Sequence, residues 1–322
     1  MVRPMARLTN DNATLEPRTT FDGPVLELDF PGLEIGVAEY DEGPTGCTVF
    51  HVPEGARCSI DVRGGSPGVS GAGYEYVHAI CLAGGSLYGL EAAAGVAAEL
   101  LAQREYRTGW MDIPIVAGAI IFDWGPRDNA VYPDKKLGRA ALRAARSGSF
   151  PLGPRGAGRS ATVGKVYHYE EAEPAGQGGA FRQVGETRIA VFTVVNAIGA
   201  IFDREGTVVR GHYDRATGVR RGLVPRVEAR LAQGRSVRPP PGNTTLTVVV
   251  TNLKLNARQL RTVGRQVHVS MARAIQPFHA LEDGDVLFAV STGEVESDPV
   301  LDTTALGIVA SELAWDAVLT SY

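Results

Sequence analysis

The segment around residue 244 places a threonine where cleavage of the chain would turn it into a nucleophile. Pro241-Gly242-Asn243-Thr244-Thr245-Leu246 joins a proline-rich connector directly to a β-branched run. A threonine hydroxyl attacks weakly until a base lies beside it. At a chain terminus the α-amine, with an ordinary pKa of about 8, supplies that base. The plain alternative is a loop with a turn-forming asparagine, and spacing alone favours this alternative.

Other patterns that suggest chemistry have simpler structural explanations. Gly158–Lys165 has one residue too many between its glycines for a phosphate loop, and Val166 stands where Ser or Thr would bind magnesium. Ser86 is better explained as a helix N-cap than as a nucleophile. Asp283-Gly284-Asp285 lacks the spacing of a calcium loop, and the six histidines contain no HExxH motif. We therefore expect neither a metal nor a cofactor.

Composition describes a globular protein without a polyanionic partner. Hydrophobic residues make up 44% and charged residues 21%, which excludes global disorder. The formal net charge is -4 and no basic cluster is present, so we expect no nucleic-acid partner. The three cysteines lack disulfide-framework or zinc spacing. With no signal peptide and no long apolar segment, the sequence predicts a cytoplasmic protein that does not contact membranes.

The elements that would position Thr244 are strands and helices in mixed order. Residues 1–23 are expected to form a flexible leader. Apolar patterns predict strands over 25–37, 47–52, 113–124, 189–195, 245–251 and 286–291, and helices over 86–103, 135–147, 256–275 and 303–319. Irregular structure is expected over 148–164, 166–188 and 217–242, the last ending in an extended connector at Pro239-Pro240-Pro241. This order favours a layered α/β sandwich over a doubly wound sheet.

Several long matches show that the chain resembles a family of N-terminal-nucleophile hydrolases. This family contains the β-aminopeptidases, the D-aminopeptidases and the nylon-oligomer hydrolases, and the nylon-oligomer group is the most similar. The resemblance covers nearly the whole chain after the leader. The matching segments are Asp29-Phe30-Pro31-Gly32, Glu42-Gly43-Pro44-Thr45-Gly46, His78-Ala79-Ile80-Cys81-Leu82-Ala83-Gly84-Gly85, Tyr88-Gly89-Leu90-Glu91-Ala92, Val131-Tyr132-Pro133-Asp134-Lys135, Gly242-Asn243-Thr244-Thr245 and Ile275-Gln276-Pro277-Phe278-His279.

The resemblance implies a precursor that cuts itself between Asn243 and Thr244. An α subunit, residues 24–243 after the leader, and a β subunit, residues 244–322, would stay together as one composite domain. The implied fold is an αββα sandwich that assembles into a homo-oligomer such as a tetramer of αβ units. Thr244 would be the nucleophile for both maturation and substrate amides.

The same resemblance assigns the other site residues. The paired acids of the family fall on Asp283 and Asp285, its lysine on Lys165 and its asparagine on Asn196. The two aspartates would orient the hydroxyl and amine, whereas Lys165 and Asn196 would stabilise the developing oxyanion. Without the resemblance, a solvated loop cation would be the preferred explanation of Lys165, and a strand-end turn that of Asn196. The family's site tyrosine falls on Phe122, so this chain lacks that hydroxyl and Phe122 becomes a candidate for the substrate pocket.

Three functions follow as alternatives. The first is endo-type hydrolysis of linear and cyclic 6-aminohexanoate oligomers, the fragments of nylon, through an acyl-enzyme. The second is a β- or D-aminopeptidase that releases N-terminal residues from small peptides and amides. The third is an uncut binding protein that keeps the fold without catalysis. The mass of the chain after expression separates the third from the others.

Overall fold

The structure, a computed structural model, describes residues 7–166, 169–236 and 242–322. The prolines of the expected connector, residues 239–241, lie outside these ranges. The α-helices are α1 (Leu90–Gln103), α2 (Lys135–Arg143), α3 (Leu223–Ala232), α4 (Ala257–Ser270) and α5 (Thr303–Leu319). The strands of the main sheet are β2 (Glu34–Tyr40), β3 (Thr45–Val62), β4 (Val69–Ser70), β5 (Tyr76–Ala83), β6 (Val116–Ile120), β10 (Gln177–Val184), β11 (Thr187–Asn196), β16 (Thr244–Leu253) and β18 (Val286–Val295). Shorter strands are β1 (Val25–Glu27), β7 (Ser149–Pro151), β8 (Thr162–Val163), β9 (Glu173–Pro174), β12 (Ala200–Phe202), β13 (Val208–Arg210), β14 (Tyr213–Asp214), β15 (Val219–Arg220) and β17 (Ile275–Gln276).

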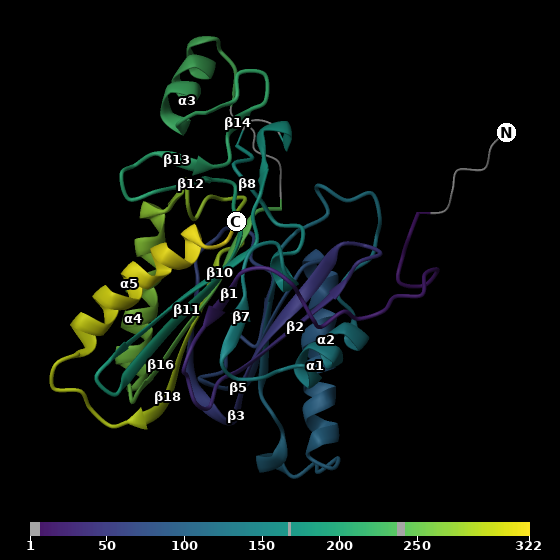
Figure 1. Cartoon of the computed structure of the whole chain (residues 1–322), viewed down its shortest axis with the longest axis vertical. Helices are drawn as coiled ribbons and strands as arrows, with labels where there is room; N and C mark the ends of the chain where they lie inside the picture. The colour runs from purple at the N-terminus through teal and green to yellow at the C-terminus, as the bar shows by residue number, and fades with distance from the viewer. Residues whose placement is uncertain (1–6, 167–168, 237–241) are drawn as a thin grey trace.

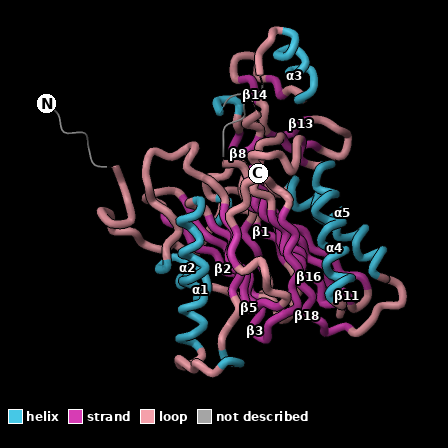
Figure 2. Tube along the Cα trace, turned by 180° about the vertical axis from the view of Figure 1, so that it is seen from behind, coloured by secondary structure: helices cyan, strands magenta, loops and turns pink. Residues whose placement is uncertain are grey.

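The main sheet doubles back on itself to give two packed layers. The first half of β3 pairs with β2 and β5, whereas its last residues pair with β18. One layer therefore holds β2, β5, β6 and β4, and the other holds β10, β11, β16 and β18 in that order. Helices α1 and α2 cover the outside of the first layer, and α4 and α5 cover the outside of the second (Figure 1). Figure 2 shows the strands of both layers between the two helix pairs.

Alternating side chains along the strands build a core on each side of every layer. In β16, Leu246, Val248 and Val250 face the other sheet layer, while Val249 and Leu253 face the helices. A period of two is what a strand buried on both faces requires. The predicted αββα sandwich is therefore confirmed, with β3 as the strand that joins its two layers.

Two elements lie where the sequence suggested irregular structure. Strand β10 begins with a glycine-rich stretch that carries little apolar pattern. A Cβ on Gly178 would lie 1.9 Å from the carbonyl oxygen of Ala317 in α5, so the glycine permits close packing of strand and helix. Helix α3, which has no buried residue, lies in the stretch expected to be irregular before residue 242. Strand β10 was missed because its glycines carry no apolar signal, whereas α3 was missed although Leu223, Val227 and Leu231 follow a helical spacing.

Three predicted helices have different ends in the structure, and one of them is the helix predicted over 135–147, which ends at Arg143. Ser86 does not cap a helix: its φ is 53°, and a short 3-10 turn, Ser86–Gly89, precedes α1. Helix α4 ends at Ser270, and Ile275 belongs to β17 instead. Asn256 does cap α4, through a capping box with Gln259.

The described part of the expected flexible leader, residues 7–23, lies against the body of the protein. Thr9 forms an isolated bridge with Ala130, and Leu15 is buried. Arg18 forms an ion pair with Glu39 through an Nη2–Oε2 distance of 2.6 Å. These contacts give the segment a defined place, which the sequence did not suggest. Among the described residues no helix is long and apolar enough to cross a membrane.

Candidate active site

Thr244 is the first residue of β16, the strand that lies between β11 and β18. Asn196, the last residue of β11, is its partner across the sheet. Asn243 forms a parallel bridge with Asp283, just before β18 begins. The fold therefore gathers the junction and two predicted site residues where three strands meet. Because every residue of β16 is buried, this end of the strand is held from both sides.

The Asn243–Thr244 junction brings a hydroxyl and a carbonyl together. Thr244 Oγ1 donates to the carbonyl oxygen of Asn243 at 2.5 Å. The backbone N–H of Gly284 donates to the same oxygen at 2.7 Å. A Cβ on Gly284 would lie 2.7 Å from Thr244 Oγ1, so a residue with a side chain would crowd the hydroxyl. The arrangement places a nucleophile beside a carbonyl whose oxygen already has a backbone donor, as an acyl shift requires.

Asp285 fixes the backbone that follows the junction. Its Oδ1 accepts the N–H of Thr245 at 2.6 Å. Its Oδ2 accepts the backbone N–H of His279 at 3.1 Å and lies 2.9 Å from His279 Nδ1. His279 therefore contacts this carboxylate through both its backbone N–H and its ring. Its φ is 61°, a left-handed conformation that a histidine adopts infrequently. His279 thus belongs to the site through Asp285.

Asp283 is buried one residue before Gly284 and binds backbone groups on two other segments. Its Oδ1 accepts the N–H of Ile198 at 3.3 Å, and its Oδ2 accepts the N–H of Ala280 at 3.0 Å. Burial, followed by the nearby charge of Asp285, raises the pKa of Asp283. The carboxyl therefore gains a proton more readily than an exposed aspartate does.

Lys165 and Asn196 form a buried pair beside the junction. Lys165 Nζ donates to the backbone oxygen of Asn196 at 3.0 Å and to its Oδ1 at 3.1 Å. Asn196 Nδ2 donates to the carbonyls of Phe122, at 3.0 Å, and Gly242, at 3.2 Å. Burial lowers the pKa of Lys165 to about 7, although the charge of Asp283 opposes this shift. Near neutral pH a large fraction of Lys165 is therefore uncharged and able to accept a proton.

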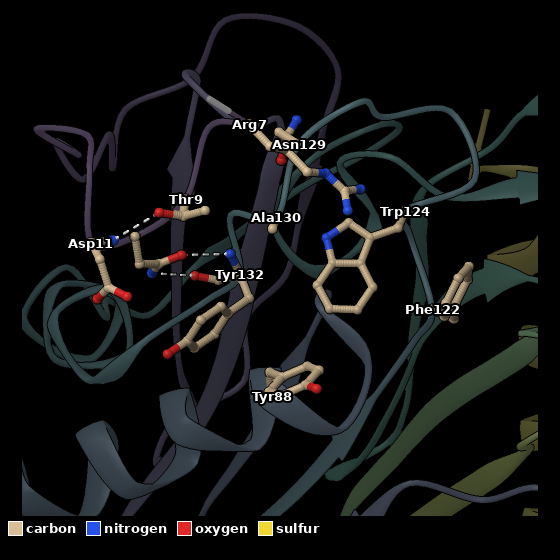
Figure 3. A pocket seen from close by; sticks show the side chains of 10 residues that line it. Arg7, Thr9, Asp11, Tyr88, Phe122, Trp124, Asn129, Ala130 and Tyr132 are labelled. Carbon is tan, nitrogen blue, oxygen red and sulfur yellow. Dashed lines mark hydrogen bonds between the residues drawn. The ribbon is translucent and has the colours of Figure 1, made fainter. Parts of the chain in front are cut away.

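Phe122 connects the junction to a neighbouring pocket. A Cβ on Gly242 would lie 2.5 Å from ring carbons of Phe122, so the ring packs directly against the chain before Asn243. The same ring lines a pocket of about 620 Å³ (Figure 3). The pocket residues come from the N-terminal segment and from loops of the first sheet layer. They are Arg7, Thr9, Asn10, Asp11, Tyr88, Phe122, Trp124, Asn129, Ala130 and Tyr132.

The structure gathers every residue that the sequence analysis selected for the site. Asn243, Thr244, Asp283, Asp285, Lys165, Asn196 and Phe122 are linked by the contacts above. Two contributors were missed: the N–H of Gly284 and the ring of His279. Gly284 lies between the paired aspartates, and His279 ends one of the segments that match the family. Both positions were therefore noted in the sequence, but no function was assigned to them. In the part of the chain that is described, no three His, Cys, Asp or Glu side chains are grouped to bind a metal.

The chain matches one protein family and is similar to several named hydrolases. Residues 28–321 match the model of Peptidase family S58. A 6-aminohexanoate-oligomer endohydrolase of Agromyces sp. (strain KY5R) is 50% identical over 96% of this chain and 89% of its own length. The enzyme of the same name from Paenarthrobacter ureafaciens is 49% identical over the same shares. The L-aminopeptidase D-Ala-esterase/amidase of Ochrobactrum anthropi, described as a variant of the Ntn hydrolase fold, superimposes with a TM-score of 0.65 at 16% identity, over 94% of this chain and 88% of its own.

Proposed function

The chain belongs to Peptidase family S58, and we propose that it is a self-cleaving hydrolase of 6-aminohexanoate oligomers. Relatives at about 50% identity that carry this activity in their names support the substrate class. The contact of Thr244 Oγ1 with the carbonyl of Asn243 supports the reaction, and it is the observation that carries the proposal. Endo-type attack on linear and cyclic oligoamides is the activity that we assign.

In maturation, Thr244 Oγ attacks the carbonyl carbon of Asn243. The hydroxyl proton passes to a base, for which we assign the neutral amine of Lys165, because the α-amine of Thr244 is still part of a peptide bond. The N–H of Gly284 stabilises the negative charge on the carbonyl oxygen. Breakage of the C–N bond leaves an ester between Asn243 and Thr244 Oγ and frees the α-amine of Thr244, whose nitrogen takes the proton from Lys165. Water then hydrolyses the ester, which gives the carboxylate of Asn243 and restores the hydroxyl of Thr244.

In turnover, a substrate amide takes the place of the Asn243 carbonyl. The freed α-amine of Thr244 accepts the hydroxyl proton and delivers it to the leaving amine. The acyl group remains on Oγ until water hydrolyses the ester. Asp285 and Asp283 hold the strand start and favour the ammonium form when it appears, while Asn196 keeps Lys165 in place.

The proposed cut would leave two chains that remain one folded unit. It gives chains of 243 and 79 residues, and the shorter one contributes β16 and β18 to the middle of the sheet. β16 pairs with β11, and β18 pairs with β3, and both partners belong to the longer chain. Two full strand ladders therefore hold the fragments together. Assembly of such αβ units into a homo-oligomer, such as a tetramer, belongs to the same proposal.

An aminopeptidase is the second candidate, and one observation favours it. The carboxylate of Asp11 lies among the pocket residues and is a suitable partner for a terminal ammonium group. Incubation with linear and cyclic 6-aminohexanoate oligomers beside β-alanyl amides distinguishes the two. Internal fragments and opening of the cyclic oligomer support the endohydrolase. Release of terminal residues alone would favour the aminopeptidase.

The intact mass of the expressed protein tests the cleavage itself. We expect wild type to give two chains that end at Asn243 and begin at Thr244. Thr244→Ala should give one uncut chain without amidase activity, because alanine has no hydroxyl that can attack the carbonyl of Asn243. Thr262→Ala, on the exposed side of α4, is the control and should be cut as wild type is. A normal cut in Thr244→Ala would show that another residue is the nucleophile.

A further inference from the structure

Four aromatic rings form a continuous row that begins at the candidate active site. Phe122, Trp124, Tyr88 and Tyr132 follow one another, and each successive pair of ring centroids is 5.8 Å apart. We call these four residues the aromatic track. All four line the 620 Å³ pocket, and Figure 3 shows Trp124 and Tyr88 between Phe122 and Tyr132. Pockets of this size and lining are typical of sites for small organic ligands.

The track runs from the scissile junction to the N-terminal segment. At one end Phe122 packs against Gly242. At the other end Asn10 is bonded to the backbone of Tyr132 in both directions: its Nδ2 donates to the carbonyl at 3.1 Å, and its Oδ1 accepts the N–H at 3.0 Å. Residues of the N-terminal segment therefore form one wall of the pocket, to which Arg7 and Asp11 contribute charged groups.

The rings are presented to the pocket and are not packed in a core. The side chain of Tyr88 is 65% exposed, although it is a large ring with two aromatic neighbours. Trp124 is held by a bond from its Nε1 to the carbonyl of Val131 at 3.3 Å, and the hydroxyl of Tyr132 donates to Glu91 Oε2 at 3.0 Å. Hydrogen bonds thus fix the edges of Trp124 and Tyr132, and the guanidinium carbon of Arg127 lies 5.7 Å from the centroid of the Trp124 ring. Phe122, Trp124 and Tyr132 are partly exposed. A grouped apolar surface of this kind marks a binding site more often than a structural feature.

We propose that the aromatic track binds the alkyl part of an oligoamide on one side of the scissile bond. This inference rests on the proposed function and explains how the same site selects its substrate. An oligomer of 6-aminohexanoate alternates five methylene groups with one amide. The methylenes would lie on the ring faces, which are apolar, and the amides or chain ends would meet the polar groups of Arg7, Asp11 and Asn129.

A track of this length also accounts for attack inside a chain. An enzyme that removes terminal residues needs a closed end that binds the terminal amine close to the nucleophile. Here the rings lead away from Thr244, so a substrate can continue beyond its reacting amide and still gain contacts. The structure therefore predicts that kcat/KM rises with oligomer length and that this rise depends on Tyr88 and Trp124.

Length dependence in single-ring variants tests the proposal. kcat/KM is measured for linear 6-aminohexanoate dimer, trimer and tetramer with wild type, Tyr88→Ala and Trp124→Ala. We expect each variant to lose about tenfold on the tetramer, chiefly through KM, and much less on the dimer. Tyr88→Phe keeps the ring and should restore the wild-type dependence. Trp110→Ala removes an exposed tryptophan outside the pocket and should behave as wild type.

The outcomes separate this proposal from the function on which it rests. Wild type that hydrolyses no oligomer would refute the proposed function. Wild type that hydrolyses oligomers while Tyr88→Ala and Trp124→Ala lose activity equally at every length, or lose none, would refute the track alone. Intact mass is recorded for each variant, and failure of Tyr88→Ala and Trp124→Ala to mature would also count against the track, because a substrate subsite is not needed for self-cleavage.

Discussion

The polar residues gathered at the start of β16 are buried: Thr244, Lys165 and Asp283 are each at most 4% exposed. Tyr88 in the aromatic track, by contrast, is 65% exposed. The first group is polar, and strand pairing and backbone N–H groups hold it on several sides. The second is apolar and lies on loops and on the short turn before α1. Phe122 touches both regions.

The two regions differ because bond cleavage and substrate selection need different surroundings. Bond cleavage depends on the position of a few atoms within a fraction of an ångström, and strands inside a buried sheet provide that rigidity. Selection of a substrate depends on contact area, which loops supply and can change without disturbing the sheet. Changes in the buried cluster of Thr244, Lys165 and Asp283 should therefore affect maturation and all substrates alike. Changes in the track should affect substrates according to their length.

Apart from loss of the nucleophile itself, the largest effect is expected from Lys165→Met. Methionine keeps much of the length and apolar stem of lysine but cannot accept a proton, so we expect maturation to slow by about 10³-fold. Lys254→Met, at an exposed lysine that pairs with Glu296, is the control and should mature normally. The rate is measured as the loss of uncut chain after cell-free synthesis, which gel electrophoresis monitors.

The pH dependence of the same reaction has a defined sign. Burial lowers the pKa of Lys165 to about 7, and the neutral amine is the form that accepts the hydroxyl proton. The wild-type maturation rate should therefore rise as the pH increases through about 7 and level off above it. A rate that falls over this range would show that Lys165 acts as a cation, the role that the family resemblance suggested.

A smaller effect is expected at the edge of the buried cluster, at His279. Both its ring and its backbone N–H bond to Asp285 Oδ2, and the ring of His268 lies 4.4 Å away, centroid to centroid, with its own Nδ1 2.9 Å from Asp61. His279→Ala removes the ring bond and places alanine at a positive φ, so we expect kcat to fall about tenfold with KM nearly unchanged. His279→Asn should recover part of the loss, because asparagine tolerates this φ and retains a donor.

The matched control for His279 is another histidine bonded to a carboxylate. His51 Nδ1 lies 2.9 Å from Glu34 Oε2, and we expect His51→Asn to leave kcat unchanged. If His279→Ala raised KM for the longer oligomers and left kcat unchanged, His279 would contribute to substrate binding. Its assignment to the buried cluster would then be wrong.

The sequence predicted the buried cluster better than the track, for physical reasons. Asp283 and Asp285 lie close in the chain and follow a family pattern, and the β-branched residues after Thr244 predict the strand that positions it. The donor at Gly284 is a backbone N–H, which no side-chain pattern can show. The rings of the track come from residues 88 to 132, and only the fold brings them into a row. Strand β10 was missed because its glycines pack through their backbone and carry no apolar signal.

The smallest effect, and the one that locates the boundary between the regions, is expected from Phe122→Tyr. This change restores the hydroxyl of the family's tyrosine on a ring that packs against Gly242 and begins the track. One added hydrogen bond near the reacting amide is worth about 1 kcal/mol, so kcat should rise by about fivefold on every oligomer. Phe21→Tyr, on a ring of the N-terminal segment, is the control. An equal rise for dimer and tetramer would place Phe122 with the buried cluster. A change that grows with oligomer length and leaves the dimer unaffected would place it with the track and contradict the expectation.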